Sequence, residues 1–385
     1  MVYSIALSAG EVSGDMFGGA LVGELSRLRG DLAFWGAGGP RMRETGVKIT
    51  ADMTGGGTIG ISEALKSLPR VCVRYLRLRR DLLRSRPDVF VPIDFGAFNI
   101  RLGQIANANG IRVVYYLPPS SWRRRPRNAD KLMACGGRVI TQFPWSAEIL
   151  AGQGLDARFV GHPLVDIVKP TQDRSEFLRG LGLSESVPTI GLLPGSRTHE
   201  IDEHFDMMIG CARIIHGELG EAQFVIGAAN RGQMMRKRVE HTASEIPGMP
   251  RIRVVEGLTY DCMAHSDFLI TKSGTATLEA AILGTPMVIV YRGTPVMRFE
   301  FLFRKSILEE FIGLPNIIAR RGVCPEFIND DAVAGKVADV ALSIMRNDAQ
   351  MERMRAELRD IRGKLGESGS IRRAAEAVLD MGGLG

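Results

Sequence analysis

The sequence is poor in aromatic residues and in cysteine, and it contains no long apolar run. Phe, Trp and Tyr make up 6% of the 385 residues, and the five cysteines are scattered without a CxxC pair. We interpret these cysteines as reduced thiols, and not as a disulfide framework. No apolar stretch approaches the roughly 20 residues that a membrane-spanning helix needs. The first residues carry no basic segment, so they predict a strand and not a signal peptide.

Several motifs with defined chemistry are also absent. The chain has no HExxH, no clustered His and Cys residues and no DxD pair, so we expect neither a metal site nor a cofactor. The GxxxxGK[ST] phosphate loop and the GxSxG elbow are missing as well. The glycine-containing turn SAGEVSGD does not have the GxGxxG spacing of a dinucleotide site. His162, in FVGHPLVD, is expected to be a turn residue. The basic residues lack interleaved stacking aromatics, which argues against nucleic-acid binding.

Glycine, by contrast, is abundant, with 45 residues, and the net charge is +6. Glycine suits tight strand-to-helix turns, and the charge favours anionic partners such as phosphates or acidic lipids. Short aliphatic runs alternate with helical patterns, which is typical of parallel α/β layers. The first series of runs covers residues 2–7, 89–93, 112–117 and 139–141. A second series covers residues 189–193, 223–227, 251–255, 268–271 and 286–290.

Two such series predict an α/β fold with two doubly wound, Rossmann-like domains. We expect the first domain over residues 1–165 and the second over residues 186–345, with the junction near residues 163–188. A helical segment over residues 346–385 follows, with an apolar stripe at helical spacing that predicts core packing. Packing of this segment back onto the first domain is one option.

Two segments of the first half carry polar groups just after a predicted strand. SAGEVSGD leaves the first strand and enters a helix, and it offers Glu11, Ser13, Gly14 and Asp15 as ligand-binding residues. The alternative is a tight turn with a helix cap. Asp94 follows the strand at 89–93, where an acid with a tuned pKa can act as a general base or can simply cap the next turn.

The basic segment WRRRPR covers residues 122–127 and offers Trp122 and Arg123 as candidate binding residues. It suits a phosphate or a lipid headgroup, and a solvated charged loop has equal weight. Residues 69–86 form a basic amphipathic pattern, which fits either an anionic bilayer surface or a core-facing helix with a solvated face. The apolar and basic stretch that begins at Met297 has the same two interpretations.

The second half contains two turns suited to phosphate. A buried strand ends in Pro-Gly195-Ser196-Arg197, where backbone amides, a hydroxyl and a guanidinium converge on a diphosphate. Ser273, Gly274 and Thr275 open a helix in a similar way. Glu279 lies four residues after Thr275 on the same helical face, where it suits two ribose hydroxyls. For Asn316 the sequence leaves two roles open, holding a turn or contacting the ligand.

These segments together resemble the bacterial lipid-A-disaccharide synthases. The matching stretches occur in the family's order over nearly the whole chain: AGEVSGD, IDFGAFNIRL, FVGHPLVD, LLPGSR, SGTATLEAAILGTPMVIVYR and LPNIIA. The sequence departs from the family in PPSSWRRRP around Trp122. It also has Gly96-Ala97 where the family carries a proline after the acid. Both departures lie in the first half of the chain, where the resemblance places the sugar acceptor.

The resemblance implies a B-type (GT-B) inverting glycosyltransferase of lipid A biosynthesis, with its active site in a cleft between two domains and without a metal. It implies transfer from UDP-2,3-diacylglucosamine to 2,3-diacylglucosamine 1-phosphate, with release of UDP. We hypothesise that Asp94 takes the proton from the acceptor 6-hydroxyl or orients this hydroxyl. The second domain is then expected to hold the nucleotide through Gly195, Ser196, Arg197, Ser273, Gly274, Thr275, Glu279 and Asn316. The acceptor lies near Glu11, Ser13, Gly14, Asp15, Trp122 and Arg123.

The same resemblance implies a cytoplasmic enzyme, peripheral on the inner face of the inner membrane of a Gram-negative-type bacterium, with a homodimer as an option. Three alternatives remain at this point. The chain is a divergent paralogue with another lipid-linked acceptor, a non-catalytic relative that binds a UDP-sugar or a lipid, or a UDP-sugar 2-epimerase on the same architecture.

Overall fold

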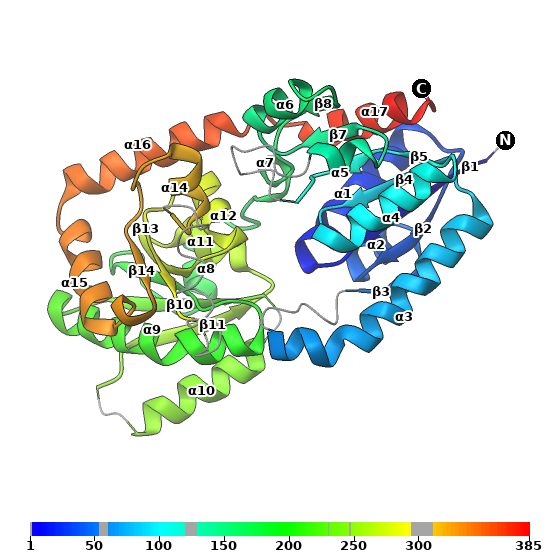
Figure 1. The fold of residues 1–385 in the computed structure, drawn as a ribbon. Helices are drawn as coiled ribbons and strands as arrows, with labels where there is room; N and C mark the ends of the chain where they lie inside the picture. Colours follow the sequence, from blue (N-terminus) through cyan, green and yellow to red (C-terminus); the bar gives the residue numbers. More distant parts are fainter. Residues whose placement is uncertain (1, 54–60, 120–128, 230, 246–247, 294–310) are drawn as a thin grey trace. The chain divides into compact units, whose positions relative to one another are not determined.

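The computed structural model describes residues 2–53, 61–119, 129–229, 231–245, 248–293 and 311–385, with only the backbone of 61–70. The chain forms two compact units. Unit 1 comprises residues 1–166 and 364–385, and unit 2 comprises residues 167–363. Each unit is built on a parallel sheet, so the predicted pair of doubly wound α/β domains is confirmed (Figure 1).

The sheet of unit 1 has the strand order β3-β2-β1-β4-β6-β7-β8, with β5 paired to β4. Its strands are β1 (Tyr3–Ala9), β2 (Leu32–Gly38), β3 (Lys48–Asp52), β4 (Val89–Ile93), β5 (Arg112–Val113), β6 (Tyr115–Tyr116), β7 (Arg138–Thr141) and β8 (Asp156–Phe159). Its helices are α1 (Val12–Leu28), α2 (Pro40–Glu44), α3 (Ile61–Ser85), α4 (Gly96–Ala108), α5 (Ala129–Met133), α6 (Pro144–Ala151) and α17 (Ser370–Gly382). The short helix α7 (Leu164–Ile167) lies at the boundary.

The sheet of unit 2 has the order β11-β10-β9-β12-β13-β14. Its strands are β9 (Thr189–Leu193), β10 (Gln223–Ala228), β11 (Arg251–Glu256), β12 (Phe268–Lys272), β13 (Met287–Tyr291) and β14 (Glu326–Ile328). Its helices are α8 (Arg174–Gly180), α9 (Thr198–Leu219), α10 (Gly232–Glu245), α11 (Thr259–His265), α12 (Thr275–Leu283), α14 (Leu314–Ala319), the 3-10 turn η2 (Asn329–Asp331), α15 (Ala334–Met345) and α16 (Asp348–Lys364).

In both sheets the central strands are apolar and fully buried, which is why they read as continuous hydrophobic runs. Every residue of β4 and of β9 is buried. Both strands begin and end where the sequence predicts them. The Gly-rich strand β2 and the short strands β3, β8 and β14 are not among the predicted runs, because none of them is a continuous aliphatic stretch.

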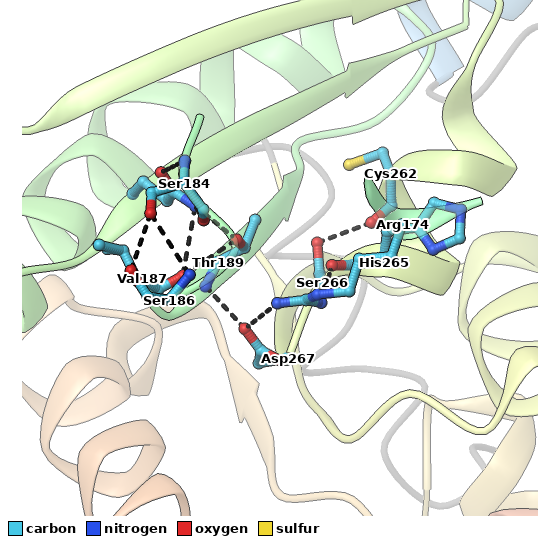
Figure 2. Close-up of polar contacts among 10 residues, drawn as sticks. Arg174, Ser184, Ser186, Val187, Thr189, Cys262, His265, Ser266 and Asp267 are labelled. Atoms are coloured by element: carbon cyan, nitrogen blue, oxygen red, sulfur yellow. Dashed lines mark hydrogen bonds and ion pairs between the residues drawn. The ribbon is translucent and has the colours of Figure 1, made fainter. Parts of the chain in front are cut away.

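The expected junction at residues 163–188 is more ordered than a linker. Arg174, in α8, donates to Asp267 at 2.9 Å, and the same Asp267 oxygen accepts the N–H of Thr189 at the start of β9, at 2.8 Å. Figure 2 shows Asp267 between these two residues. Two further backbone N–H groups, of Thr171 and Gln172, donate to the buried carboxylate of Asp261. These contacts fix the segment to the amino-end side of the sheet of unit 2.

The segment expected as one piece over residues 346–385 is shared between the units. In α16, Met354 packs within 3.3 Å of the Met287 nitrogen of β13, in unit 2. In unit 1, α17 packs against α1. The carboxylate of Asp166 accepts the N–H groups of Gly369 and Ile371, and so caps the start of α17. The boundary between the two units therefore comes at residues 363 and 364.

Candidate active site

In each sheet one pair of neighbouring strands marks the point where the strand order reverses. The pair is β1 and β4 in unit 1, and β9 and β12 in unit 2. Open parallel sheets bind ligands at the carboxyl ends of such a pair, because the connections leave it toward opposite sides. The turns that follow these four strands contain Glu11, Asp94, Arg197 and the stretch 273–275. The topology therefore brings most of the predicted site residues of each unit to one edge of its sheet.

Asp94 lies on a sharply folded turn after β4. Its φ is 45°, and Phe95 and Gly96 follow with φ of 56° and 40°. Non-glycine residues adopt this left-handed region at a cost, of order 1–3 kcal/mol each, and such residues cluster at functional sites. The turn is held because the Asp94 carbonyl accepts the Tyr115 hydroxyl at 2.8 Å and the Asn99 side-chain amide at 3.1 Å.

Asn99 joins the ends of β1 and β4. Its side chain is fully buried, donates to the carbonyls of Ser8 and Ile93, and accepts the Ser8 hydroxyl at 2.6 Å. Gly10 completes the junction, because a Cβ there would lie 2.1 Å from the Phe95 ring. Asn99, Tyr115 and Phe95 are therefore positioning residues for Asp94. The sequence analysis singled out none of them, although Asn99 and Phe95 lie within the matched stretch IDFGAFNIRL.

The carboxyl group of Asp94 is hard to ionise. Burial is the main cause, the negative charge of Glu11 adds to it, and together they raise the pKa of Asp94 to about 6. A carboxylate with a pKa near the working pH is suited to proton transfer, because it is mostly ionised and yet basic. Glu11 is the N-cap residue of α1 and is half-buried. Ser13 is half-buried and Gly14 is buried in the first turn of the same helix.

Asp15 has a different environment from its neighbours. Its carboxylate is buried and accepts three backbone N–H groups, from Gly39, Arg41 and Met42, at 2.7 to 3.1 Å. These groups form the N-terminus of α2, so Asp15 ties α1 to α2. Asp15 is therefore a positioning residue for α2, and its expected contact with the acceptor stays a prediction. Trp122 and Arg123 lie outside the described residues, as does the stretch that begins at Met297.

In unit 2 the two phosphate-suited turns are linked by ion pairs. The buried carboxylate of Glu200, in the first turn of α9, lies 2.8 Å from Lys272 Nζ and 3.2 Å from a guanidinium nitrogen of Arg197. Burial opposes its ionisation, but the charge and hydrogen bond of Lys272, the Ser196 N–H and the charge of Arg197 together outweigh burial and hold the pKa of Glu200 at about 2. Lys272 ends β12 and precedes Ser273, so it connects the β9 turn with the β12 turn.

The carboxylate of Glu200 also accepts hydrogen bonds from the backbone of the turn that follows β9. One of its oxygens accepts the N–H of Ser196 at 3.0 Å and that of Arg197 at 3.3 Å. Gly195 has a φ of 118°, and a Cβ there would lie 2.7 Å from Glu200. The expectation that these two amides face a diphosphate is therefore corrected. An internal carboxylate takes them, and the groups left for an anion are the side chains of Ser196 and Arg197 together with Lys272.

His204 extends this network to β13. Its Nε2 accepts the N–H of Arg292 at 2.9 Å, so the ring proton is on Nδ1, which lies 2.7 Å from the Glu200 carbonyl. Burial lowers the pKa of His204 to about 4, and the positive charges of Lys272 and Arg292 act in the same direction. The sequence analysis assigned no role to Glu200, Lys272, His204 or Arg292. A signal was present for Glu200, because an acid at the third helical position is a known capping pattern.

The β12 turn is built more simply. The Ser273 hydroxyl donates to the Ile312 carbonyl at 2.8 Å, which holds the segment before α14. Gly274 is the N-cap of α12, and Thr275 is exposed at its first position. The first N–H groups of a helix have no partner within it, so this end suits an anion. Glu279, one turn later, accepts the Tyr260 hydroxyl at 3.3 Å, and burial raises its pKa to about 7.

Asn316 holds a turn. It is fully buried, and its side-chain amide donates to the Cys324 carbonyl and to Glu326, at 2.7 Å each. Its oxygen accepts the N–H groups of Val323 and Cys324 at 2.8 Å each. An amide side chain has two donors and two acceptor sites, and all four are in use. The structure thus shows the turn-holding contacts of Asn316, and its contact with the nucleotide stays a prediction.

Comparisons with known proteins agree with the motifs. The family model described as lipid-A-disaccharide synthetase matches residues 5–380. The chain belongs to the lipid-A-disaccharide synthase family. A lipid-A-disaccharide synthase of Geobacter sulfurreducens is 35% identical over 98% of this chain and 97% of its own length. The one of Azotobacter vinelandii is 33% identical over 99% and 98%. The chain is thus a glycosyltransferase of lipid A disaccharide synthesis.

Solved structures share the fold at low sequence identity. A calicheamicin glycosyltransferase has a TM-score of 0.60 at 15% identity, covering 99% of this chain and 98% of its own. A UDP-GlcNAc 2-epimerase of Neisseria meningitidis bound to UDP-GlcNAc has a TM-score of 0.60 at 12% identity, covering 99% and 100%. At these identities the likeness concerns the GT-B architecture alone. The epimerase alternative is set aside because of the family match along the sequence.

Proposed function

We propose that the chain transfers 2,3-diacylglucosamine from its UDP-linked form to the 6-hydroxyl of 2,3-diacylglucosamine 1-phosphate. The products are a β-1,6-linked disaccharide 1-phosphate and UDP. The observation that carries the proposal is the match of the lipid-A-disaccharide synthetase family model to residues 5–380. The strained turn that presents Asp94, a carboxyl group with a pKa of about 6, at the point where the strand order of unit 1 reverses supports Asp94 as the base. This placement suits activation of a sugar hydroxyl.

In the proposed reaction the Asp94 carboxylate takes the proton of the acceptor hydroxyl. The hydroxyl oxygen attacks the anomeric carbon from the face opposite the diphosphate, so the configuration inverts. The bond from the anomeric carbon to the diphosphate oxygen breaks, and UDP leaves with the electron pair. Arg197, Lys272 and the start of α12 are positioned to stabilise the negative charge that develops on the leaving group.

The remaining assignments follow the same division between the two units. Ser196, Ser273 and Thr275 contact the diphosphate, and Glu279 holds the ribose hydroxyls. Glu11, Ser13 and Gly14 line the acceptor side next to Asp94. Gly195, Asp15 and Asn316 act through the backbone that they hold. Burial raises the pKa of Glu279 to about 7, and its carboxyl group can bind two vicinal hydroxyl groups in addition to the Tyr260 hydroxyl.

A product assay tests the proposal. The purified protein is incubated with UDP-2,3-diacylglucosamine, with and without 2,3-diacylglucosamine 1-phosphate, and the products are identified by mass spectrometry. We expect disaccharide 1-phosphate and UDP only when both substrates are present. UDP binding without disaccharide would overturn the acceptor assignment, and isomerised UDP-sugar without an acceptor would point to epimerase chemistry.

We also propose that α3 lies on an anionic membrane surface. Leu78 and Leu82 are buried in the core, as the alternative of a core-facing helix predicts. The outer face nevertheless keeps Val73 at 66% exposure and Leu76 at 56%, beside exposed Arg77 and Arg80. Apolar and basic side chains on one helical face suit a lipid headgroup layer. Among the described residues no helix is long and apolar enough to cross a membrane.

Sedimentation with vesicles tests this surface. We expect the chain to bind vesicles that contain phosphatidylglycerol, and the double variant Val73→Ser with Leu76→Ser to bind several-fold less. The matched control is Val333→Ser, which replaces an exposed apolar residue of unit 2 with serine in the same way. Val333 is 43% exposed. Equal binding by all three proteins would contradict the assignment.

A further inference from the structure

Arg292 has an unmet hydrogen-bonding need. It follows β13 directly, and its Nε atom is buried. Among the described residues, none accepts a hydrogen bond from this nitrogen. A buried donor without a partner costs roughly 1–3 kcal/mol, so native structures leave few of them without a reason. A group supplied by a ligand is one such reason.

The position of Arg292 indicates which ligand group that is. β13 is the neighbour of β12, so Arg292 and Lys272 lie at the same carboxyl edge of the sheet. The backbone N–H of Arg292 is fixed by His204, which is in turn hydrogen-bonded to the carbonyl of Glu200. His204 experiences the charges of Lys272, Glu200 and Arg292 together. The guanidinium of Arg292 is thus within electrostatic reach of the network that joins the two phosphate-suited turns.

Within the network of Arg197, Lys272, Arg292 and Glu200, the positive charges outnumber the negative ones. Arg197, Lys272 and Arg292 carry three positive charges, and Glu200, the carboxylate that pairs with the first two, carries one negative charge. Two positive charges remain. The diphosphate of a nucleotide sugar carries two negative charges at neutral pH. Because the Ser196 and Arg197 amides are occupied by Glu200, the groups that remain for the diphosphate are side-chain cations and the start of α12.

We propose that Arg292 binds the diphosphate of the donor nucleotide, as a third cation beside Arg197 and Lys272. The proposal rests on the proposed function for the identity of the ligand as a UDP-sugar. Arg292 is then a binding residue, and His204 is its positioning residue, because the imidazole fixes the backbone from which the guanidinium extends. A guanidinium suits this role because its donors are planar and its charge is permanent.

A series of nucleotides tests the proposal by calorimetric titration. UDP, UMP and uridine are titrated into the wild-type chain, into Arg292→Gln and into a control, Arg251→Gln. Arg251 starts β11 at the amino end of the same sheet, where it is exposed and donates to the Gly182 carbonyl. The control therefore removes a guanidinium from unit 2 far from the proposed contact.

For Arg292→Gln we expect the dissociation constant of UDP to rise about 10- to 100-fold, the range for a lost charge-assisted hydrogen bond. The change should be smaller for UMP and within twofold for uridine. Arg251→Gln should bind all three ligands as the wild type does. Arg292→Lys, which keeps the charge without the Nε donor, should lie between the wild type and Arg292→Gln, and it substitutes for Arg292→Gln if that variant fails to fold.

Two results would overturn the proposal. One is unchanged UDP affinity in Arg292→Gln, which would mean that a bound water satisfies the buried nitrogen. The other is an equal loss for UDP and uridine, which would mean that Arg292 only supports the fold of the site. The proposed function fails separately, if the wild type forms no disaccharide. Phosphate-dependent binding through Arg292 would then still stand.

Discussion

The reversal points of the two sheets share one topology and differ in charge. In unit 1 the turns after β1 and β4 present two carboxyl groups, Glu11 and Asp94, and the second is held in a strained backbone conformation. In unit 2 the turn after β9 presents Arg197 and the end of β12 presents Lys272, and both surround one internal carboxylate, Glu200. The first edge suits proton transfer and the second suits an anion. The same scaffold therefore separates the two tasks of a transfer reaction, and the side chains of a few turns decide which unit performs which.

The carboxylate of unit 1 should dominate turnover. Asp94→Asn keeps the shape of the side chain but cannot accept a proton, so we expect the rate of disaccharide formation to fall about 10²- to 10⁴-fold. The measurement is kcat by product quantification. Asp52→Asn, at the exposed end of β3, is the matched control and should keep the wild-type rate. Near wild-type turnover in Asp94→Asn would contradict the claim that unit 1 carries the proton transfer.

The internal carboxylate of unit 2 should dominate stability. Glu200→Gln removes a buried charge that two cations and two amides share, and we expect the free energy of unfolding to fall by about 3 kcal/mol. Urea denaturation at pH 7 measures the change. Glu203→Gln, on the same helix, is the control and should unfold as the wild type does. A loss below 0.5 kcal/mol would mean that the cations do not depend on Glu200.

The same carboxylate gives a pH dependence with a definite sign. The pKa of Glu200 is about 2 in the folded chain and about 4.5 in the unfolded chain, so the unfolded state binds its proton more readily. The stabilisation by Glu200 is therefore complete above about pH 4.5 and is lost as the pH falls toward 2. Denaturation of the wild type and of Glu200→Gln between pH 3 and 7 should show a steeper acid loss in the wild type. Parallel curves would contradict this sign.

The sequence predicted the edges better than the contacts within them. The fully buried strands β4 and β9 are continuous apolar runs in the sequence, so their bounds and the turns that follow them were predictable. The role of Asn316 was not predictable, because the sequence does not distinguish a buried amide with four local partners from an amide that binds a ligand. Nor was the occupation of the Ser196 and Arg197 amides by Glu200, since it depends on how α9 enters from its turn.

The left-handed backbone of Asp94 and Phe95 was also beyond the sequence. Only glycine signals positive φ with any regularity, and here two other residues adopt it because Tyr115 and Asn99 hold the carbonyl between them. Tyr115 is 21 residues away along the chain, and such contacts arise only once the sheet has formed. What the sequence supplies is the acid after a buried strand, and what tertiary structure supplies is its tuning.

The second carboxyl group of unit 1 should have the smallest effect, on the pH profile. Glu11→Gln removes a negative charge that raises the pKa of Asp94, so Asp94 should ionise at lower pH. The acid limb of kcat/KM, near pH 6 in the wild type, should move down by up to about one pH unit, as expected for a neighbouring charge. An unmoved limb would show that the two carboxyl groups do not interact.

The most direct test of the division between the units measures two quantities on two variants. UDP affinity and kcat are determined for Asp94→Asn and for Arg197→Gln. The account predicts wild-type UDP affinity with lost turnover in Asp94→Asn. It predicts UDP affinity weakened about 10- to 100-fold in Arg197→Gln, the range for one charge-assisted hydrogen bond. Equal weakening of UDP binding in both variants would contradict the claim that one edge carries the proton transfer and the other carries the nucleotide.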